Sequence, residues 1–339
     1  LLVCVGTKPA YFGHPEWEAH APGLKNLNDA LRIREKFFLS TEIASRIPNP
    51  ADRKHLLTVV IVGAGPTGVE LAGSMSEILH KSLRSDFRNL STDELRIVLV
   101  EGGDRVLGTF HPKLSERAKQ DLEKLGVEVR LKTFVKNVTA EGVQVGEEWI
   151  PTVNAIWAAG NAAEDVLASL GTEQDRMGRV LVTPHLHLPD DPNVFVLGDA
   201  AHALGADGKP LPGVAQVALQ QGKYLAKAIA SGKPLNSLPA FAYKNLGNMA
   251  TIGRAKAVVE MPGGGRITGL LAWLMWAVVH VFKLVEGRDR WRVLSEWSWF
   301  YITFSPGARL LYGYGKNAPA FAQQAVAQLR PTPEAAPVG

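Results

Sequence analysis

The alternation of hydrophobic and polar residues predicts an α/β fold in the middle of the chain. A β-branched run at residues 58–62 predicts a buried strand, and a glycine-rich turn and a helical pattern at 69–79 follow it. The same pattern predicts strands at 95–100, 127–138 and 153–158 and a helix at 113–125. Strands that alternate with helices in this way are typical of a doubly wound parallel sheet.

The segments on either side of this region follow a different pattern. Residues 10–55 form a connector with one expected helix, for which Asn28-Asp29 supplies the cap. We expect short buried strands at 1–5 and 193–197 and a long helix at 212–230. The Pro- and Ala-containing tail from residue 316 is predicted to be disordered.

The glycine-rich turn carries the clearest chemistry. Gly63, Gly65 and Gly68 have GxGxxG spacing directly after a strand and at the start of a helix. In that context the first glycine permits a tight turn, the second lets the backbone approach a pyrophosphate, and the third lets helix pack on strand. The helix N-terminus then offers N–H groups to the phosphates. A nicotinamide dinucleotide site is predicted, against the alternative of a turn that binds nothing.

Glu101 ends the second predicted strand, where folds of this kind place an acid on the adenosine ribose. A carboxylate there accepts hydrogen bonds from the ribose hydroxyls and repels a 2′-phosphate. The position therefore favours NADH over NADPH. The alternative is a surface acid at a strand end.

Composition narrows the classes of function. Hydrophobic residues make up 46% of the 339 positions and charged residues 21%, as in globular proteins. The net charge of +4 comes without a long Lys/Arg run, so nucleic acid is not an expected partner.

Cys4 is the single cysteine, which excludes a disulfide or a redox-active cysteine pair within the chain. No metal site is expected from the spacing of possible ligands. The chain opens inside a predicted strand, and we expect that upstream sequence is missing.

A second motif, Gly198-Asp199, follows the predicted strand at 193–197. By itself it is equally consistent with an acid that meets a polyol and phosphate and with an ordinary helix cap. Its order with the other motifs resembles the flavoproteins with two dinucleotide-binding domains, and is most similar to type II NADH:quinone oxidoreductases. The stretches that carry the resemblance are 63–71, 198–201, 215–222 and 249–253.

The resemblance implies two Rossmann-like dinucleotide-binding domains, with the FAD domain incomplete at its N-terminus, plus C-terminal amphipathic helices on a membrane surface. FAD and NADH are the implied cofactors. The implied division is 1–55 (end of the first FAD segment and connector), 56–165 (NADH domain), 166–262 (second FAD segment), 263–315 (membrane-associating segment) and 316–339 (tail).

Roles for individual residues also follow only from the resemblance. Asp199, after Gly198, would bind the FAD ribityl or phosphate region. Gly6 and Thr7 would lie close to the flavin, and Gly160 would line the nicotinamide side. The stretch after Gly160 departs from the usual family pattern, and the family's first glycine-rich fingerprint would precede Leu1.

Three residues are implied to act in catalysis. Gln216 and Gln220, four residues apart on one helix face, would lie beside the isoalloxazine and face the quinone. Glu70 would approach the flavin and tune hydride transfer or proton supply. The alternatives are polar surface positions for the two glutamines and, for Glu70, a first-turn acid favoured by the helix dipole.

Residues 269–282 are almost entirely apolar, with Arg288, Arg290 and Arg292 close behind. Fourteen helical residues span about 21 Å, short of the ~30 Å hydrocarbon core of a bilayer. The aromatic residues that follow are Trp291, Trp297, Trp299, Phe300, Tyr301 and Phe304. A segment in the membrane interface is predicted. The alternatives are a buried helix or dimer interface, or a true span. His280 is expected to be an interfacial or packed histidine rather than a ligand.

The resemblance, together with these patterns, implies a non-proton-pumping NADH:quinone oxidoreductase. Its expected partners are a membrane quinone and the lipid surface, with a possible homodimer, at the cytoplasmic face of the inner membrane. Two alternatives stay open: a flavin-dependent NADH reductase of a small redox protein, and a truncated NAD-binding fragment without activity.

Overall fold

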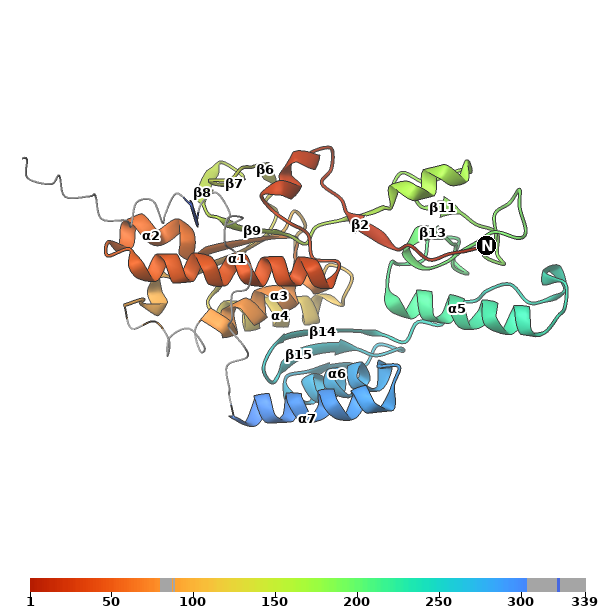
Figure 1. The fold of residues 1–339 in the computed structure, drawn as a ribbon. Coiled ribbons are helices and arrows are strands. Elements are labelled where there is room, and N and C mark those ends of the chain that lie inside the picture. Colours follow the sequence, from red (N-terminus) through yellow and green to blue (C-terminus); the bar gives the residue numbers. More distant parts are fainter. Residues whose placement is uncertain (80–86, 88, 304–321, 324–339) are drawn as a thin grey trace, which may run out of the picture. The chain divides into compact units, whose positions relative to one another are not determined.

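The structure, a computed structural model, describes residues 1–79, 87, 89–303 and 322–323. Its contacts divide the chain into two units (Figure 1). Unit 1 comprises Leu1–Ala10 and Gly160–Gly247, and unit 2 comprises Tyr11–Ala159 and Asn248–Gly339. The connector and the segment after residue 247 therefore belong to the same unit as the glycine-rich turn.

Unit 2 is built on a four-stranded parallel sheet of order β5-β4-β3-β9. Its strands are β3 (Thr58–Val62), β4 (Arg96–Val100), β5 (Val127–Arg130) and β9 (Asn154–Trp157). Every residue of β3 is buried because both faces of the sheet are covered, which explains the unbroken apolar run. Val59 and Ile61 face one core cluster, and Val60 and Val62 face another.

Helices pack on one of the two faces of this sheet. They are α1 (Leu27–Arg46), α2 (Pro50–Leu57), α3 (Pro66–Glu77) and α4 (Pro112–Lys124). The predicted connector helix is confirmed as α1, but its cap is not Asn28: the helix starts after Asn26, which forms a capping box with Asp29. The sequence analysis missed α2, although Asn49 caps it and Pro50 occupies its first turn.

Antiparallel sheets, which the sequence analysis did not predict, complete unit 2. The first joins β6 (Val135–Val138), β7 (Gly142–Val145) and β8 (Glu148–Pro151), and the second joins β14 (Asn248–Gly253), β15 (Lys256–Glu260) and β16 (Arg266–Thr268). The prediction of one strand over 127–138 was wrong. The chain turns between β5 and β6, where Lys132 has a φ of 52°.

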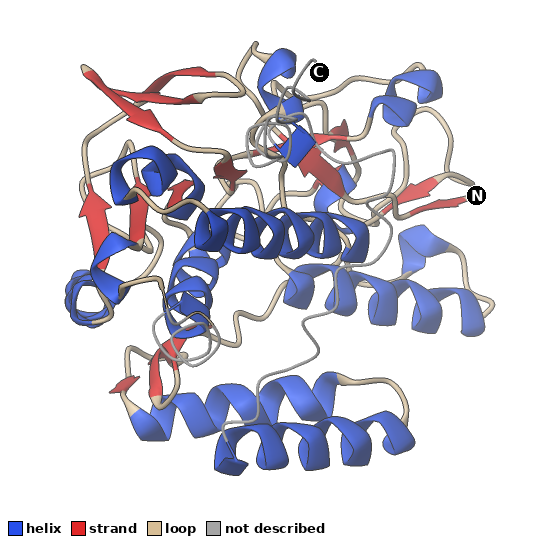
Figure 2. Ribbon diagram, turned by 60° about the vertical axis from the view of Figure 1, so that its left-hand side comes forward, coloured by secondary structure: helices blue, strands red, loops and turns tan. Residues whose placement is uncertain are grey.

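The predicted apolar helix is confirmed as α6 (Leu270–Lys283), and α7 (Gly287–Thr303) packs beside it (Figure 2). Only Ala272 and Val281 of α6 are buried. Its exposed apolar residues include Leu270, Leu271 and Phe282. Among the described residues, no helix combines the length and the apolar character that crossing a membrane requires.

Unit 1 consists of short paired strands and one long helix. Parallel pairing joins β1 (Leu2–Val3) to β12 (Phe195–Val196) and β11 (Val180–Leu181) to β13 (Ala201–His202), while β2 (Thr7–Pro9) pairs with β10 (Asn161–Ala163) in the antiparallel direction. The expected helix at 212–230 is α5, which begins later, at Ala215, and ends at Ala230. Most of the tail predicted to be disordered lies outside the described residues, as does Phe304.

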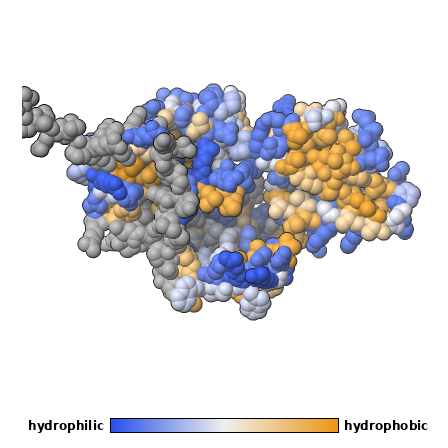
Figure 3. Space-filling model, viewed as in Figure 1, coloured by the Kyte–Doolittle hydropathy of each residue, from blue (hydrophilic) through white to orange (hydrophobic). Residues whose placement is uncertain are grey.

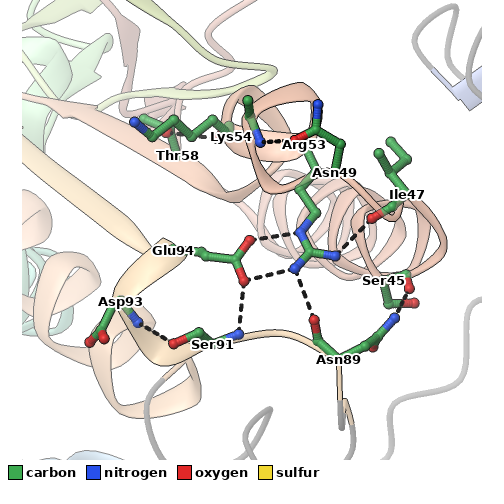
Figure 4. Close-up of polar contacts among 11 residues, drawn as sticks. Ser45, Ile47, Asn49, Arg53, Lys54, Thr58, Asn89, Ser91, Asp93 and Glu94 are labelled. Carbon is green, nitrogen blue, oxygen red and sulfur yellow. Dashed lines mark hydrogen bonds and ion pairs between the residues drawn. The ribbon is translucent and has the colours of Figure 1, made fainter.

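A buried ion pair fixes the region before β4 in unit 2 (Figure 4). The guanidinium of Arg53 donates from Nε and Nη2 to the Glu94 carboxylate, at 2.7 and 2.8 Å. It also donates to the carbonyl oxygens of Ile47 and Asn89. The Arg53 side chain is only 5% exposed, and its four hydrogen bonds join the end of α1, α2 and the loop before β4.

Candidate functional site

The glycine-rich turn in unit 2 connects β3 to α3, and each glycine meets a different requirement. Gly63 has a φ of 99°, which favours glycine. A Cβ on Gly68 would lie 1.8 Å from the Gly63 carbonyl oxygen, so only glycine lets helix and turn approach this closely. No atom lies within 4 Å of the Cβ position of Gly65. The turn is therefore tight on the protein side and open where a ligand would approach.

Glu101 lies beside this turn. Its Oε2 accepts a hydrogen bond from the backbone N–H of Ala64 at 2.7 Å, and Oε1 accepts from Gly103 at 2.8 Å. A carboxylate has about four acceptor positions, so two remain for ribose hydroxyls. The structure thus brings Gly63, Gly65, Gly68 and Glu101 together in one unit, at the carboxyl ends of β3 and β4.

Glu70 lies farther along α3, where its Oε1 accepts the backbone N–H of Thr251 at 3.2 Å. Burial raises the pKa of the Glu70 carboxyl, and the Thr251 hydrogen bond and nearby His280 oppose that rise only in part. This carboxyl therefore binds a proton more readily than an exposed glutamate does. His280 is exposed and stacks on Trp276, with ring centroids 4.2 Å apart.

Unit 1 holds the second group of candidate residues, around a cavity of about 770 Å³. Gly6, Gly198 and Asp199 line this cavity, which is otherwise mainly apolar. Figure 3 shows hydrophobic residues gathered over a face of this unit, at the right of the view. Thr7 Oγ1 lies 3.5 Å from Asp199 Oδ2 and donates a long hydrogen bond to it. A Cβ on Gly213 would lie 3.4 Å from the Asp199 carboxyl carbon, so the acid is approached closely from that side.

Gln216 and Gln220 both lie on α5, and both bind the backbone of residues 244–247. The Gln216 amide accepts from Leu246 N–H and donates to Gly247 O, each at 3.0 Å. The Gln220 amide accepts from and donates to the backbone of Lys244, at 2.9 and 2.8 Å. Each amide nitrogen keeps a second N–H. The structure therefore shows a structural role for both glutamines, and the quinone-facing role stays a prediction.

Gln221 is a site residue that the sequence analysis missed. Its side chain is 1% exposed, and its Oε1 accepts the backbone N–H of Gly198 at 2.6 Å. Among the residues that the structure describes, its Nε2 has no hydrogen-bond partner. The Gln220-Gln221 pair in the sequence was a signal, but the partner is 23 positions away and only the fold reveals it.

Gly160 stands where the chain enters unit 1 for the second time, with a φ of 70°. Its carbonyl accepts the N–H of Ala10, next to the pairing of β2 with β10. The ion pair between Lys8 and Asp165 (2.5 Å) extends this pairing. Within the described part of the chain, no cluster of three or more His, Cys, Asp and Glu residues could hold a metal ion.

Comparison with known proteins decides the family. The pyridine nucleotide-disulphide oxidoreductase model matches residues 1–222, and the NDH2 C-terminal domain model matches residues 245–303. The chain is 39% identical over 324 residues to the type II NADH:quinone oxidoreductase NdhA of Mycobacterium tuberculosis, covering 91% of this chain and 67% of the relative. The chain belongs to the type II NADH:quinone oxidoreductase family.

More distant type II relatives agree. An internal alternative NAD(P)H-ubiquinone oxidoreductase A1 of Arabidopsis thaliana mitochondria is 32% identical, over 88% of this chain and 61% of that relative. The structure of NDH2 from Plasmodium falciparum in complex with NADH has a TM-score of 0.81 at 20% identity, over 90% of this chain and 78% of that one, which confirms the fold. The type II flavoproteins use FAD and NADH.

Proposed function

We propose that this chain is an FAD-dependent NADH:quinone oxidoreductase that does not pump protons. The proposal is supported by two features that suit dinucleotides, in one chain that also matches the NDH2 C-terminal domain. The first feature is the glycine-rich turn with Glu101, and the second is the cavity that Asp199 lines.

Unit 2 would hold NADH. The open backbone at Gly65 and the N-terminus of α3 receive the pyrophosphate, and the free acceptor positions of Glu101 receive the ribose hydroxyls. Gly63 and Gly68 keep the turn close enough to the helix for its N–H groups to point at the phosphates.

Unit 1 would hold FAD, and its residues fit such a group. Asp199 supplies a carboxylate at the cavity wall, and Gly6 leaves the approach to it open. The buried Nε2 of Gln221 is an unused donor close to the Gly198 backbone, of the kind a polar cofactor can satisfy. When bound, the flavin supplies two-electron storage between a hydride donor and a quinone.

The remaining catalytic task is proton supply. Reduction of a quinone by NADH takes up one proton from solution, and Glu70 is a buried carboxyl whose raised pKa suits it to hold that proton. Gln216 and Gln220 contribute by fixing residues 244–247 and by the second N–H of each amide. Gly160 would line the nicotinamide side.

We further propose that residues 263–303 rest on lipid; the rest of the predicted membrane segment, 304–315, lies outside the described residues. The exposed apolar surface of α6 and the arginines at 288, 290 and 292 suit an apolar layer and anionic head groups, respectively. A peripheral position is the family's property, and the cytoplasmic face of the inner membrane and a homodimer are part of the proposal.

The test uses the purified chain with FAD, lipid vesicles and a short-chain quinone, with NADH absorbance as readout. We expect NADH oxidation that depends on both FAD and quinone and is faster with NADH than with NADPH. Oxidation that needs a small redox protein instead of quinone would contradict the proposal, as would no oxidation by protein that is folded and holds FAD.

A further inference from the structure

An aromatic ring lies exposed beside the ribose-binding acid of unit 2. Phe134 stands between β5 and β6, and 70% of its surface is exposed. A single exposed phenylalanine is common on protein surfaces and by itself indicates nothing. The position of this one is fixed by its surroundings.

Backbone hydrogen bonds hold the Phe134 loop against the loop that carries Glu101. Thr133 N–H donates to the Glu101 carbonyl at 3.0 Å, and Lys132 N–H donates to the Gly103 carbonyl at 2.8 Å. These bonds lie immediately before Phe134 and on either side of Gly102. The backbone that carries Phe134 is therefore held against the backbone of residues 101–103.

Gly102 supports one side of the ring. A Cβ at this position would lie 2.6 Å from Cε1 of Phe134 and 3.0 Å from Cζ, so any larger residue would displace the ring. The carbonyl of Phe134 accepts the N–H of Gly146 at 2.9 Å, which fixes the loop from the other side. One side of the ring thus rests on backbone while most of its surface is open to solvent.

We propose that Phe134 stacks on the adenine of NADH and is a positioning residue for the nucleotide. This inference rests on the proposed NADH site. If Glu101 meets the adenosine ribose, the base joined to that ribose lies near the 101–103 loop, and the Phe134 ring lies against Gly102 of that loop. Stacking on an aromatic side chain uses the π-face that every base has. The site therefore gains affinity for the base without reading its hydrogen-bonding edge.

The experiment measures binding of ADP-ribose, which carries the adenine half but no nicotinamide, to the purified chain by calorimetry. Three variants separate the contributions: Phe134→Ala removes the ring, Phe134→Tyr keeps it, and Phe134→Leu keeps apolar bulk without a π-face. We expect Phe134→Ala to raise the Kd about tenfold and Phe134→Tyr to change it less than about twofold, with Phe134→Leu close to Phe134→Ala. Thermal unfolding checks that each variant is folded, which the exposure of the ring favours.

Kinetics give the second readout. Phe134→Ala should raise KM for NADH about tenfold with kcat unchanged, and should leave KM for reduced nicotinamide mononucleotide unchanged because that donor has no adenine. Equal affinity of wild type and Phe134→Ala for ADP-ribose would overturn the inference, as would an equal loss with both donors. Wild-type protein that binds ADP-ribose with the expected dependence on Phe134 but does not reduce quinone would refute the proposed function and leave this inference standing.

Discussion

Alanine at Gly65 should leave the stability of the fold nearly unchanged and alanine at Gly68 should lower it, although the two glycines belong to one motif. At Gly65 a Cβ has no atom within 4 Å, and the backbone φ of −68° and ψ of −177° suit alanine. At Gly68 a Cβ would lie 1.8 Å from the Gly63 carbonyl oxygen, well inside van der Waals contact. Neither the turn nor α3 can move away without losing contacts with β3.

These geometries set the expected magnitudes. Gly65→Ala should change the free energy of unfolding by less than about 1 kcal/mol, since alanine gains from a less flexible unfolded chain and loses slightly as a helix cap. Gly68→Ala should lower it by about 3 kcal/mol, the upper range for an overpacked site. Both variants should weaken NADH binding at least about tenfold, the first because its methyl occupies the pyrophosphate approach and the second because the turn is displaced.

Urea denaturation and NADH titration, carried out on the same preparations, separate the two effects. Gly65→Ala is the decisive variant because it should be as stable as wild type and yet deficient in binding. Wild-type affinity for NADH in this variant would refute the assignment of the turn as a pyrophosphate site. A large loss of stability in Gly65→Ala would show that the turn is not open as described.

Three further outcomes follow from the polar contacts. Glu101→Gln should reduce the preference for NADH over NADPH, measured as the ratio of the two KM values, about tenfold, because an N–H replaces one acceptor oxygen beside two backbone donors. The control Asp104→Asn removes a charge from the same loop and should leave this ratio unchanged. Equal KM ratios in the two variants would contradict the prediction. Arg53→Met should lower the free energy of unfolding, measured in urea, by about 3–5 kcal/mol because it leaves the Glu94 carboxylate without its partner. The double variant Arg53→Met/Glu94→Gln should recover part of that loss. Burial raises the pKa of Asp175, but hydrogen bonds from His202 and Arg179 outweigh it and bring the pKa to about 2, from an ordinary value of 3.8. Stability from Asp175 is therefore present above pH 3.8 and lost as the pH falls toward 2, so the difference in unfolding free energy between wild type and Asp175→Asn should shrink across that window.

The elements that the sequence predicted correctly are those whose signals are local. The strand at 58–62, the glycine-rich turn and α3 follow one another within twenty residues, and each has its own pattern of β-branched, glycine or helical positions. The position of Glu101 beside the turn followed from the rule that parallel strands end at a common edge. The hydrogen bonds to Ala64 and Gly103 confirm that Glu101 lies at the turn, while its role toward the ribose stays a prediction.

The elements that were missed depend on distant partners. The strand β14 packs closely on α3 at Gly73. A Cβ on Gly73 would lie 1.7 Å from the Ile252 carbonyl oxygen, so only glycine permits this contact. The sequence around residue 252 gives no sign of it. Gln221 was missed for the same reason, since its partner Gly198 lies in a different element. The turn between β5 and β6 was hidden because apolar and polar residues alternate through most of residues 127–138, and with it the loop that places Phe134 against Gly102 was missed.

The central claim is that electrons from NADH reach a quinone through this one protein. The most direct measurement is the stoichiometry of the anaerobic reaction of the FAD-loaded chain in vesicles, with NADH followed by absorbance and quinol by chromatography. We expect one quinol to form for each NADH consumed. NADH loss without quinol, from folded protein that retains FAD, would contradict it.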